Sequence, residues 1–455
     1  MGEHAILTAR LLLWALCAGA VVLPLRWAFV CMILASHLDI TTASFTSSSS
    51  IGFENSIRIV ALPTILLLRT RFRPLKDFDW GLPHKLWIAL ILYAGIASFW
   101  SEFPLSAVKM VIYLMIYLII YMIFLDGWRN GLIDARSVKI ATLAVLALAV
   151  VQTYVLGNYA GTEDRLTSFS TPQYFAAYLL AVLAILLFSG EGGLLHGVCC
   201  ASVVLAIVLS GSRYIFVSMI ALGAIAAFRP SARSRKGPAF KSILVRSALI
   251  GTVAVIGTAA LIKYFPTSRV DELLEVTNTR DAAIEDIGTL AWRLGIYSEI
   301  MDQLKARSPR QFFFGSGTSS GAGLMLDFQP SLYVESGVDG VDGNRVLHSE
   351  FLRSLYEWGI PGIAILSLFV VCVCAAFARK LAVEGPGSSL AFLGVFPSIV
   401  FGLAIENLLA GAGSAAGIGI VLALTFAWQG PRVALRDSRR GKLVPSDGAL
   451  LKAGA

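Results

Sequence analysis

Residues 174–188 read YFAAYLLAVLAILLF, an apolar run without a charged side chain. Similar uncharged runs occupy residues 86–100, 141–156 and 247–262. The chain has 455 residues, is 56% hydrophobic and has a mean hydropathy of +0.75, which is far too apolar for a soluble globule. Only a helix or a closed barrel satisfies its backbone hydrogen bonds in lipid. We therefore predict an all-α polytopic membrane protein with about 12 transmembrane helices.

The net charge of +8 arises from basic residues that cluster in short connections between apolar runs. A nucleic-acid partner is not expected, because the positive-inside rule explains this distribution without one. The rule places basic segments near residues 69–85, at 229–241 and in the tail after 430 in the cytoplasm. All six cysteines lie in apolar stretches, so we expect no disulfide framework.

The number of apolar segments between the basic ones tests this topology, because each crossing changes the side of the membrane. We expect spans near residues 85–100, 106–125, 138–156, 172–189, 195–211, 213–228, 242–264, 359–378, 388–409 and 412–428. Six of them separate the first two basic segments and four separate the second from the tail, so all three segments share one side. Residues 8–37 leave two interpretations open: two short helices broken at Pro24, or one span with a re-entrant flank.

The predicted topology divides the chain into four parts. These are N-terminal transmembrane helices at 1–264, one large periplasmic loop at 265–347, C-terminal transmembrane helices at 348–430 and a cytoplasmic tail at 431–455. In the large loop, Trp292, Ile296, Ile300 and Leu304 recur every four residues and predict an amphipathic helix against the membrane domain. The stretch FFFGSGTSSGAG at 312–323 is expected to be a loop, because its glycines and serines interrupt regular structure.

Several charged residues lie where the positive-inside rule disfavours them. Arg58, Lys109 and Arg213 fall at or near external ends of predicted spans, and Arg165 falls in a short external loop. Four cations at one membrane level suit a polyanionic head group such as a diphosphate, although each could instead snorkel separately to the interface. Glu406 interrupts an apolar run at its external end, where it would orient a sugar hydroxyl, act as a base or simply end the helix.

His348 stands beside the large external loop and opens the stretch HSEFLRSLYEWGIPG. Leu352 and Leu355 continue a helical apolar face after it, so His348 and Arg345 are expected at the mouth of the following span. The stretch resembles the O-antigen ligase and O-antigen polymerase superfamily of inner-membrane glycan-transfer enzymes. The pattern of that family is a His, then Asn, Ser or Gln, then nine residues, then Gly-x-x-Gly.

In this sequence the pattern is met by His348, Ser349, Gly359 and Gly362, with Ser349 in place of the commoner Asn. Other stretches are similar to the family and come in its order: residues 98–104, residues 165–173, residues 210–213, and Trp292-Arg293 with Gly315-Ser-Gly317. The resemblance covers about residues 85–410.

The resemblance implies transfer of an oligosaccharide from undecaprenyl diphosphate to an acceptor hydroxyl at the periplasmic face of a bacterial inner membrane. The acceptor is another carrier-linked repeat in an O-antigen or exopolysaccharide polymerase, which we favour, and lipid A core in a ligase. The resemblance also implies membrane lipids and polysaccharide-assembly proteins as possible partners. A membrane transporter is the alternative of another class, against which stand charges gathered at one face and no similarity between the two halves.

The expected chemistry is cleavage of a sugar–diphosphate bond through an oxocarbenium-like state, while negative charge grows on the leaving phosphate. Arg213 and Arg293 match the family's arginines and are expected to bind the diphosphate, with Arg345 as a third. His348 is expected to take the proton of the attacking hydroxyl, because an imidazole with a pKa of about 6.5 is partly basic near neutrality. The alternative is a histidine that only caps the helix. No Asp-x-Asp pair on an external loop offers a divalent-ion site, so no metal or other cofactor is expected.

Overall fold

A computed structural model gives the structure of the protein. It describes residues 3–38, 60–76, 78, 80–155, 165–166, 168, 172–188, 193–228, 289–328, 347, 349–384, 395–400, 402–404, 419–420 and 423. Every regular element within these ranges is a helix, which confirms the predicted all-α class. The spans predicted at 242–264 and 412–428 and the basic segment at 229–241 lie largely or wholly outside the described residues.

The helices follow the predicted apolar runs closely. They are α1 (Glu3–Val22), α2 (Leu25–His37), α4 (Leu62–Arg69), α5 (Arg73–Lys76), α6 (Leu82–Ala97), η3 (Ser98–Trp100), α7 (Pro104–Arg129), α8 (Ala135–Val150), η4 (Val151–Val155), α9 (Pro172–Phe188), α10 (Leu194–Leu209), α11 (Arg213–Phe228), α14 (Thr289–Ala306), α15 (Pro309–Phe314), α16 (Gly321–Phe328) and α17 (Glu350–Glu384). Of the two interpretations of the N-terminus, two helices broken at Pro24 is the correct one.

Four helices are long and apolar enough to cross a membrane: Leu82–Trp100, Pro104–Arg129, Ala135–Val155 and Glu350–Arg379. Shorter apolar helices accompany them, among them Leu25–His37 and Tyr174–Phe188. The protein therefore has the character of an integral membrane protein. The total of about 12 spans stays a prediction.

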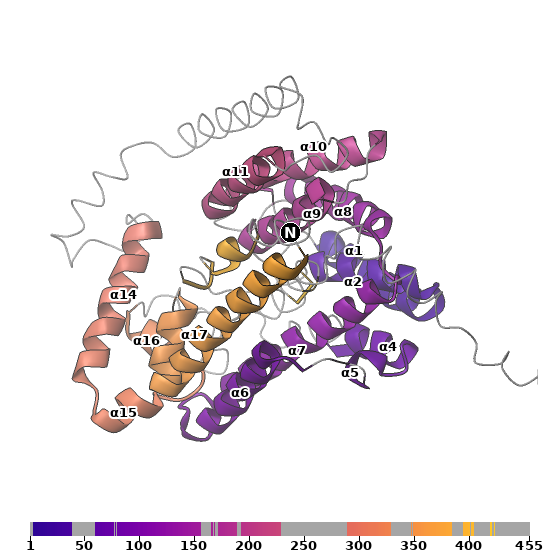
Figure 1. Cartoon of the computed structure of the whole chain (residues 1–455). Coiled ribbons are helices and arrows are strands. Elements are labelled where there is room, and N and C mark those ends of the chain that lie inside the picture. Colours follow the sequence, from indigo (N-terminus) through magenta and orange to yellow (C-terminus); the bar gives the residue numbers. More distant parts are fainter. Residues whose placement is uncertain are drawn as a thin grey trace, which may run out of the picture.

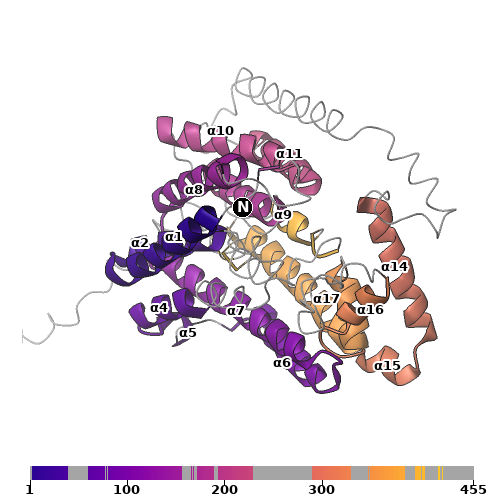
Figure 2. The same ribbon diagram turned by 180° about the vertical axis from the view of Figure 1, so that it is seen from behind.

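Helix α9 lies at the centre of the bundle and packs against α8, α10 and α11 (Figures 1 and 2). Almost every side chain from Tyr174 to Phe188 is buried, as expected of a helix that is apolar on all sides and surrounded by other helices. Its Tyr178 hydroxyl lies 3.0 Å from the Thr142 hydroxyl, and its ring meets His37 edge to face at 4.4 Å between centroids. These contacts fix α9 to α8 and α2.

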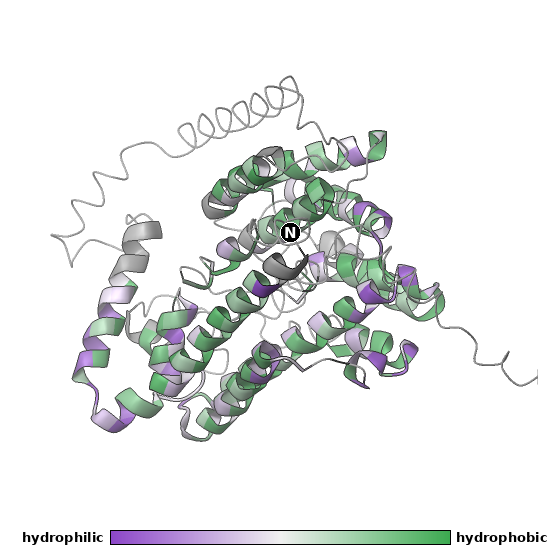
Figure 3. Cartoon of the chain, in the orientation of Figure 1, coloured by the Kyte–Doolittle hydropathy of each residue, from purple (hydrophilic) through white to green (hydrophobic). Residues whose placement is uncertain are grey.

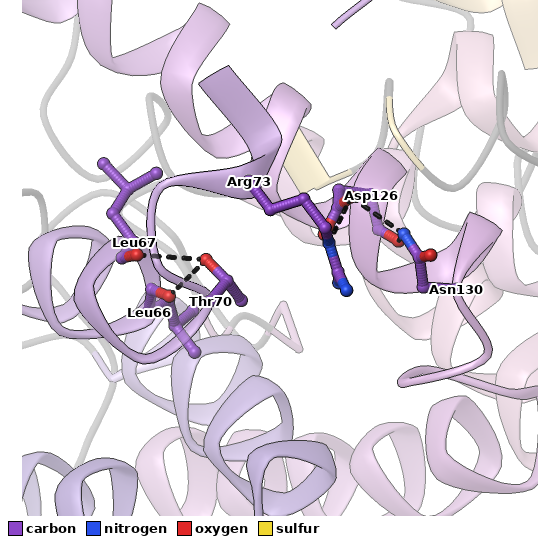
Figure 4. Close-up of polar contacts among 6 residues, drawn as sticks. All are labelled: Leu66, Leu67, Thr70, Arg73, Asp126 and Asn130. Atoms are coloured by element: carbon purple, nitrogen blue, oxygen red, sulfur yellow. Dashed lines mark hydrogen bonds and ion pairs between the residues drawn. The ribbon is translucent and has the colours of Figure 1, made fainter. Parts of the chain in front are cut away.

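Helices α14, α15 and α16 gather at one end of the molecule, and α4 and α5 lie away from them (Figures 1 and 2). Beside α5, the Arg73 guanidinium lies 2.8 Å from the Asp126 carboxylate, which also accepts a hydrogen bond of 2.8 Å from the Asn130 amide (Figure 4). The Thr70 hydroxyl donates to the Leu66 carbonyl at 2.8 Å and helps to end α4. The basic segment after α4 thus meets the C-terminus of α7, as the predicted topology requires.

The N-terminus of α8 is held to the start of α2. Asp134 accepts hydrogen bonds from the Ser137 amide at 2.7 Å and from the Arg26 guanidinium at 2.7 Å. Burial raises the pKa of Asp134, but the bonds from Ser137 and the charge of Arg26 outweigh it and hold the pKa below its ordinary value. Arg26 therefore faces an ionised partner.

Helix α17 is kinked, because its backbone leaves helical geometry at Gly359 (φ 61°, ψ −155°) and Pro361 follows. The predicted loop at 312–323 is partly wrong. A capping box between Ser308 and Gln311 starts α15, which runs to Phe314 and ends at Gly315 with φ 79°. Only residues 315–320, which we name the glycine loop, separate α15 from α16.

Candidate functional site

The segment around Arg165 packs onto the turn between α10 and α11. The Leu166 amide donates to the Leu209 carbonyl at 3.0 Å, and the Ser168 hydroxyl donates to the His37 carbonyl at 3.1 Å. The Arg165 side chain lies beside Gly211, where an added Cβ would come 3.3 Å from its Nε. Gly211 has φ 64°, a conformation that favours glycine. Two stretches that carry the family resemblance thus meet in space.

Helix α11 begins at Arg213, as predicted, and the Phe216 amide donates to the Ser212 carbonyl at 2.9 Å in its first turn. The structure describes the backbone of Arg213 but not its side chain. A helix N-terminus carries partial positive charge from its free N–H groups. The Arg165 guanidinium and the start of α11 therefore lie next to each other, which is an arrangement suited to an anion.

The glycine loop is bound to the kink of α17. The Ser316 amide donates to the Tyr356 carbonyl at 3.0 Å, and the Gly317 amide donates to the Glu357 carbonyl at 2.9 Å. The Glu357 carbonyl has no donor four residues later in its own helix, because Pro361 lacks an N–H group. The loop supplies the missing donor.

The carboxylate of Glu357 binds the same loop a second time. It accepts the Ser319 amide at 2.9 Å and the Gly321 amide at 3.3 Å, and the side chain is buried. A buried carboxylate is stabilised only when such donors replace water. One residue of α17 thus binds three backbone amides of the loop and of the start of α16.

The opposite side of the glycine loop contacts the end of α6. The Thr318 hydroxyl donates to the Ala94 carbonyl at 2.6 Å and accepts from the Trp358 indole at 3.0 Å. The Ser101 hydroxyl donates to the Thr318 carbonyl at 2.5 Å. The loop is therefore bound on both sides, and it joins residues 98–104 to the kink of α17.

Close approach explains the glycines at this junction. A Cβ at Gly317 would lie 2.7 Å from the Ser101 Cα. A Cβ at Gly359 would overlap the Phe313 carbonyl oxygen, and a Cβ at Gly315 would overlap the Glu357 carbonyl oxygen. Glycine is required where backbones come this close. The glycines of the family pattern thus serve to pack the loop.

The head of α17 is capped by Ser349, whose hydroxyl accepts the Leu352 amide at 3.3 Å. Serine and asparagine are both favourable N-cap residues, so Ser349 in place of the family's commoner Asn keeps the capping hydrogen bond. Leu347 and Ser349, the neighbours of His348 in sequence, are buried. His348 and Arg345 themselves lie outside the described residues.

Three charged residues of α17 escaped the sequence analysis. Glu350, Arg353 and Glu357 are buried, and Glu350 pairs with Arg353 at 2.6 Å although each side chain is only 1% exposed. Their spacing of three and four residues puts them on one face of an otherwise apolar helix. The sequence did contain a signal for these residues, because charged side chains at helical spacing near the start of an apolar span usually have a structural or functional role.

Arg307 was also missed, and it fixes the corner between α14 and α15. Its guanidinium donates to the Tyr356 carbonyl at 2.8 Å and to the Ser316 hydroxyl at 2.5 Å, and it stacks 3.8 Å over the Tyr356 ring. Burial lowers the pKa of Arg307, and the neighbouring Tyr356 opposes this shift. Nothing in its local sequence distinguished Arg307 from other loop cations.

The amphipathic helix predicted in the large loop is confirmed as α14. Ile296, Ile300 and Leu304 are buried in one cluster with Leu324, Leu347 and Tyr356. Helix α14 packs against α16 and α17 and carries Trp292 and Arg293, whose side chains lie outside the described part. Its backbone places Arg293 on the helix that packs against α16 and α17.

The remaining predicted site residues are not brought together by the described contacts. Lys109 is exposed on α7. The described contacts join it neither to Arg165 and the start of α11 nor to the glycine loop and α17. Arg58 and Glu406 lie outside the described residues. Within the described ranges, no three His, Cys, Asp or Glu side chains are grouped for a metal ion.

Comparison with known proteins identifies the segment that contains most of these features. Residues 198–367 match the family model described as O-Antigen ligase. No curated protein matches the chain. The matched segment includes the start of α11, helix α14, the glycine loop and the head of α17. Residues 198–367 are thus similar to an O-antigen ligase domain, in agreement with the resemblance to the O-antigen ligase and polymerase superfamily.

Proposed function

We propose that this membrane protein transfers a glycan from undecaprenyl diphosphate to an acceptor hydroxyl. The observation that carries the proposal is the O-antigen ligase match, which supports glycan transfer of this type and spans Arg213, Arg293, Arg345 and His348. The packing of Arg165 onto the start of α11 and the binding of the glycine loop to α17 support it independently.

In this proposal the diphosphate binds at the start of α11. Arg165 and Arg213 contact its oxygens, with Arg293 and Arg345 completing the cationic site from the large loop, and Arg58 and Lys109 adding positive charge. A guanidinium binds phosphate through two parallel hydrogen bonds, and it absorbs the negative charge that grows as the sugar–phosphate bond breaks. No metal ion is required for this role.

His348 acts as the general base on the acceptor hydroxyl. It directly precedes the capped head of α17, which the glycine loop binds through Glu357. General-base help of this kind contributes about 10²–10⁴-fold to a rate. Glu406 is proposed to orient a sugar hydroxyl.

The proposed reaction takes place at the periplasmic face of the bacterial inner membrane. Helices α14, α15 and α16 lie at one end of the bundle, in the segment that the charge distribution places outside (Figure 1). The basic segment after α4 lies away from them, as expected of a cytoplasmic end.

For the acceptor we favour a second carrier-linked repeat, which makes the protein a polymerase. Transfer to lipid A core, which makes it a ligase, is the alternative within the same chemistry. The glycans of a deletion strain distinguish the two. Loss of a polymerase leaves single repeats, whereas loss of a ligase leaves long carrier-linked chains.

The test of the mechanism is His348→Ala in the full chain, assayed with a lipid-linked donor in the presence and absence of a chelator. We expect transfer to be lost, the protein to remain folded in the membrane, and the wild-type rate to be insensitive to the chelator. His196→Ala is the control, because His196 lies on α10 outside both junctions. Glycan of wild-type length from His348→Ala would refute the assignment.

A further inference from the structure

Helix α15 presents three consecutive phenylalanines on its surface. Phe312, Phe313 and Phe314 are 40%, 46% and 47% exposed. Contiguous exposed aromatic surface of this kind marks an interaction site in a folded protein. With six residues, α15 is too short to cross a bilayer and is not among the candidate spans.

The position of α15 is fixed at the ends of two membrane spans. The Tyr93 hydroxyl of α6 donates to the Phe314 carbonyl at 3.4 Å. The Phe313 carbonyl lies so close to Gly359 that a Cβ there would overlap it. Helix α15 therefore packs beside the last two turns of the span Leu82–Trp100 and beside the kink of α17.

Further exposed aromatic and apolar side chains lie on the neighbouring spans. Phe99 is 91% exposed, Trp100 is also exposed, and Leu105 is exposed at the start of α7. Leu92 and Ile96 extend the exposed apolar surface along α6 into the membrane region. Figure 3 colours α6 and the adjoining part of α15 predominantly hydrophobic. Aromatic side chains gather in this way at the level of lipid head groups.

We infer that α15 is a membrane-surface anchor whose phenylalanines insert into the interfacial region of the bilayer. The partner is the bilayer itself, because the exposed phenylalanines lie on a helix that is bound to α6, a candidate membrane span with exposed apolar side chains of its own. Arg310, exposed on the same helix, reaches the lipid phosphates while the rings enter the acyl boundary.

The anchor has a consequence for the site, which rests on the proposed function. Gly315 ends α15 and starts the glycine loop, so insertion of α15 fixes the height of that loop relative to the lipid surface. The loop in turn binds the head of α17. A carrier-lipid diphosphate lies at the same level of the membrane, where the donor and the acceptor must meet.

The test is site-specific photo-crosslinking of the full chain in nanodiscs of phosphatidylethanolamine and phosphatidylglycerol. Phe313 is replaced by p-benzoylphenylalanine, a close match in shape, and mass spectrometry identifies the adducts. Lys305, whose side chain is 72% exposed on α14, is replaced in the same way as the control. We expect phospholipid adducts at position 313 and only background at position 305.

Adducts at position 313 that join only to protein, or equal lipid adducts at both positions, would overturn the anchor. Phe312 is a second labelling position in case the first variant does not accumulate. The readout does not require glycan transfer. An inactive protein with lipid adducts at position 313 therefore keeps the anchor and rejects the proposed function, and the reverse outcome rejects the anchor alone.

Discussion

Two contacts between distant segments each depend on a single residue. Gly211 permits the contact of Arg165 with the start of α11, and Glu357 makes the contact of the glycine loop with α17. Gly211 leaves room for the Arg165 side chain, and Glu357 binds the glycine loop through its carboxylate and its carbonyl. Neither residue needs to contact the substrate in order to affect transfer. Gly211 leaves Arg165 beside the start of α11, and Glu357 holds the glycine loop against the head of α17.

Gly211→Ala should weaken binding of the lipid-linked donor. The new Cβ meets the Arg165 side chain, and a non-glycine residue in the left-handed region costs about 1–2 kcal/mol. Donor titration in nanodiscs should show a raised KM. Gly197→Ala on α10 is the matched control, because a Cβ there meets nothing within 4 Å, and it should leave transfer unchanged. An unaltered KM in Gly211→Ala would argue against a role for Arg165 in donor binding.

Glu357→Gln should loosen the glycine loop. The amide group of glutamine offers one acceptor oxygen in place of two, so the Ser319 or the Gly321 amide loses its partner at a cost of about 1–3 kcal/mol. Thermal unfolding in detergent should shift to lower temperature, and kcat should fall more than donor affinity. Glu299→Gln is the control, since that carboxylate accepts only from Gln303 among the hydrogen bonds that the structure describes, and the stability of this variant should match the wild type.

At the scale of the element, the kink of α17 decides how the large loop meets the membrane helices. The kink exposes carbonyls that receive amides of the glycine loop, and Gly359 allows α15 to approach. A straight helix would have neither the free Glu357 carbonyl nor the space. The close approach at the helix break therefore accounts for Gly359, the first glycine of the Gly-x-x-Gly pattern.

Gly359→Ala should undock α15 and the glycine loop. Alanine is strained at φ 61° and ψ −155°, and its Cβ would overlap the Phe313 carbonyl. We expect strong loss of transfer and faster proteolysis between α14 and α17 in membrane vesicles. Gly95→Ala on α6, where a Cβ meets nothing within 4 Å, should resist proteolysis like the wild type. Equal proteolysis of the two variants would contradict this account of the kink.

At the scale of the whole molecule, polar contacts hold the two ends of the bundle. Arg73 with Asp126 and Arg26 with Asp134 lie at the end away from α14, and the glycine loop junction lies beside α14. Apolar helices connect the two ends. The same division follows from the charge distribution in the sequence.

Lys305→Cys and Lys76→Cys should react from opposite sides of the membrane. A membrane-impermeant maleimide added to spheroplasts should label position 305 at once and position 76 only after permeabilisation, because the positive-inside rule places them in different compartments. The wild-type chain, whose cysteines are largely buried or lie in apolar helices, gives the background labelling. Labelling of both positions in intact spheroplasts would refute the topology.

From the sequence alone it was possible to predict the helical class, the position of most described helices, the amphipathic α14 and the resemblance to the O-antigen ligase and polymerase superfamily. These properties depend on local composition and periodicity, which are set within one helix or one motif. The start of α11 at Arg213 follows from the same local signals.

Which segments meet depends on how the helices pack in three dimensions. The binding of the glycine loop by Glu357, the corner fixed by Arg307 and the contact of Arg165 with Gly211 join residues far apart in sequence. These hydrogen bonds involve backbone groups, and nearly every residue carries the same N–H donor and C=O acceptor. The sequence therefore does not show which backbone groups pair, because the pairing depends on how the helices pack. The exposure of the α15 phenylalanines and their position beside Tyr93 and Gly359 likewise follow from packing and cannot be read from the sequence.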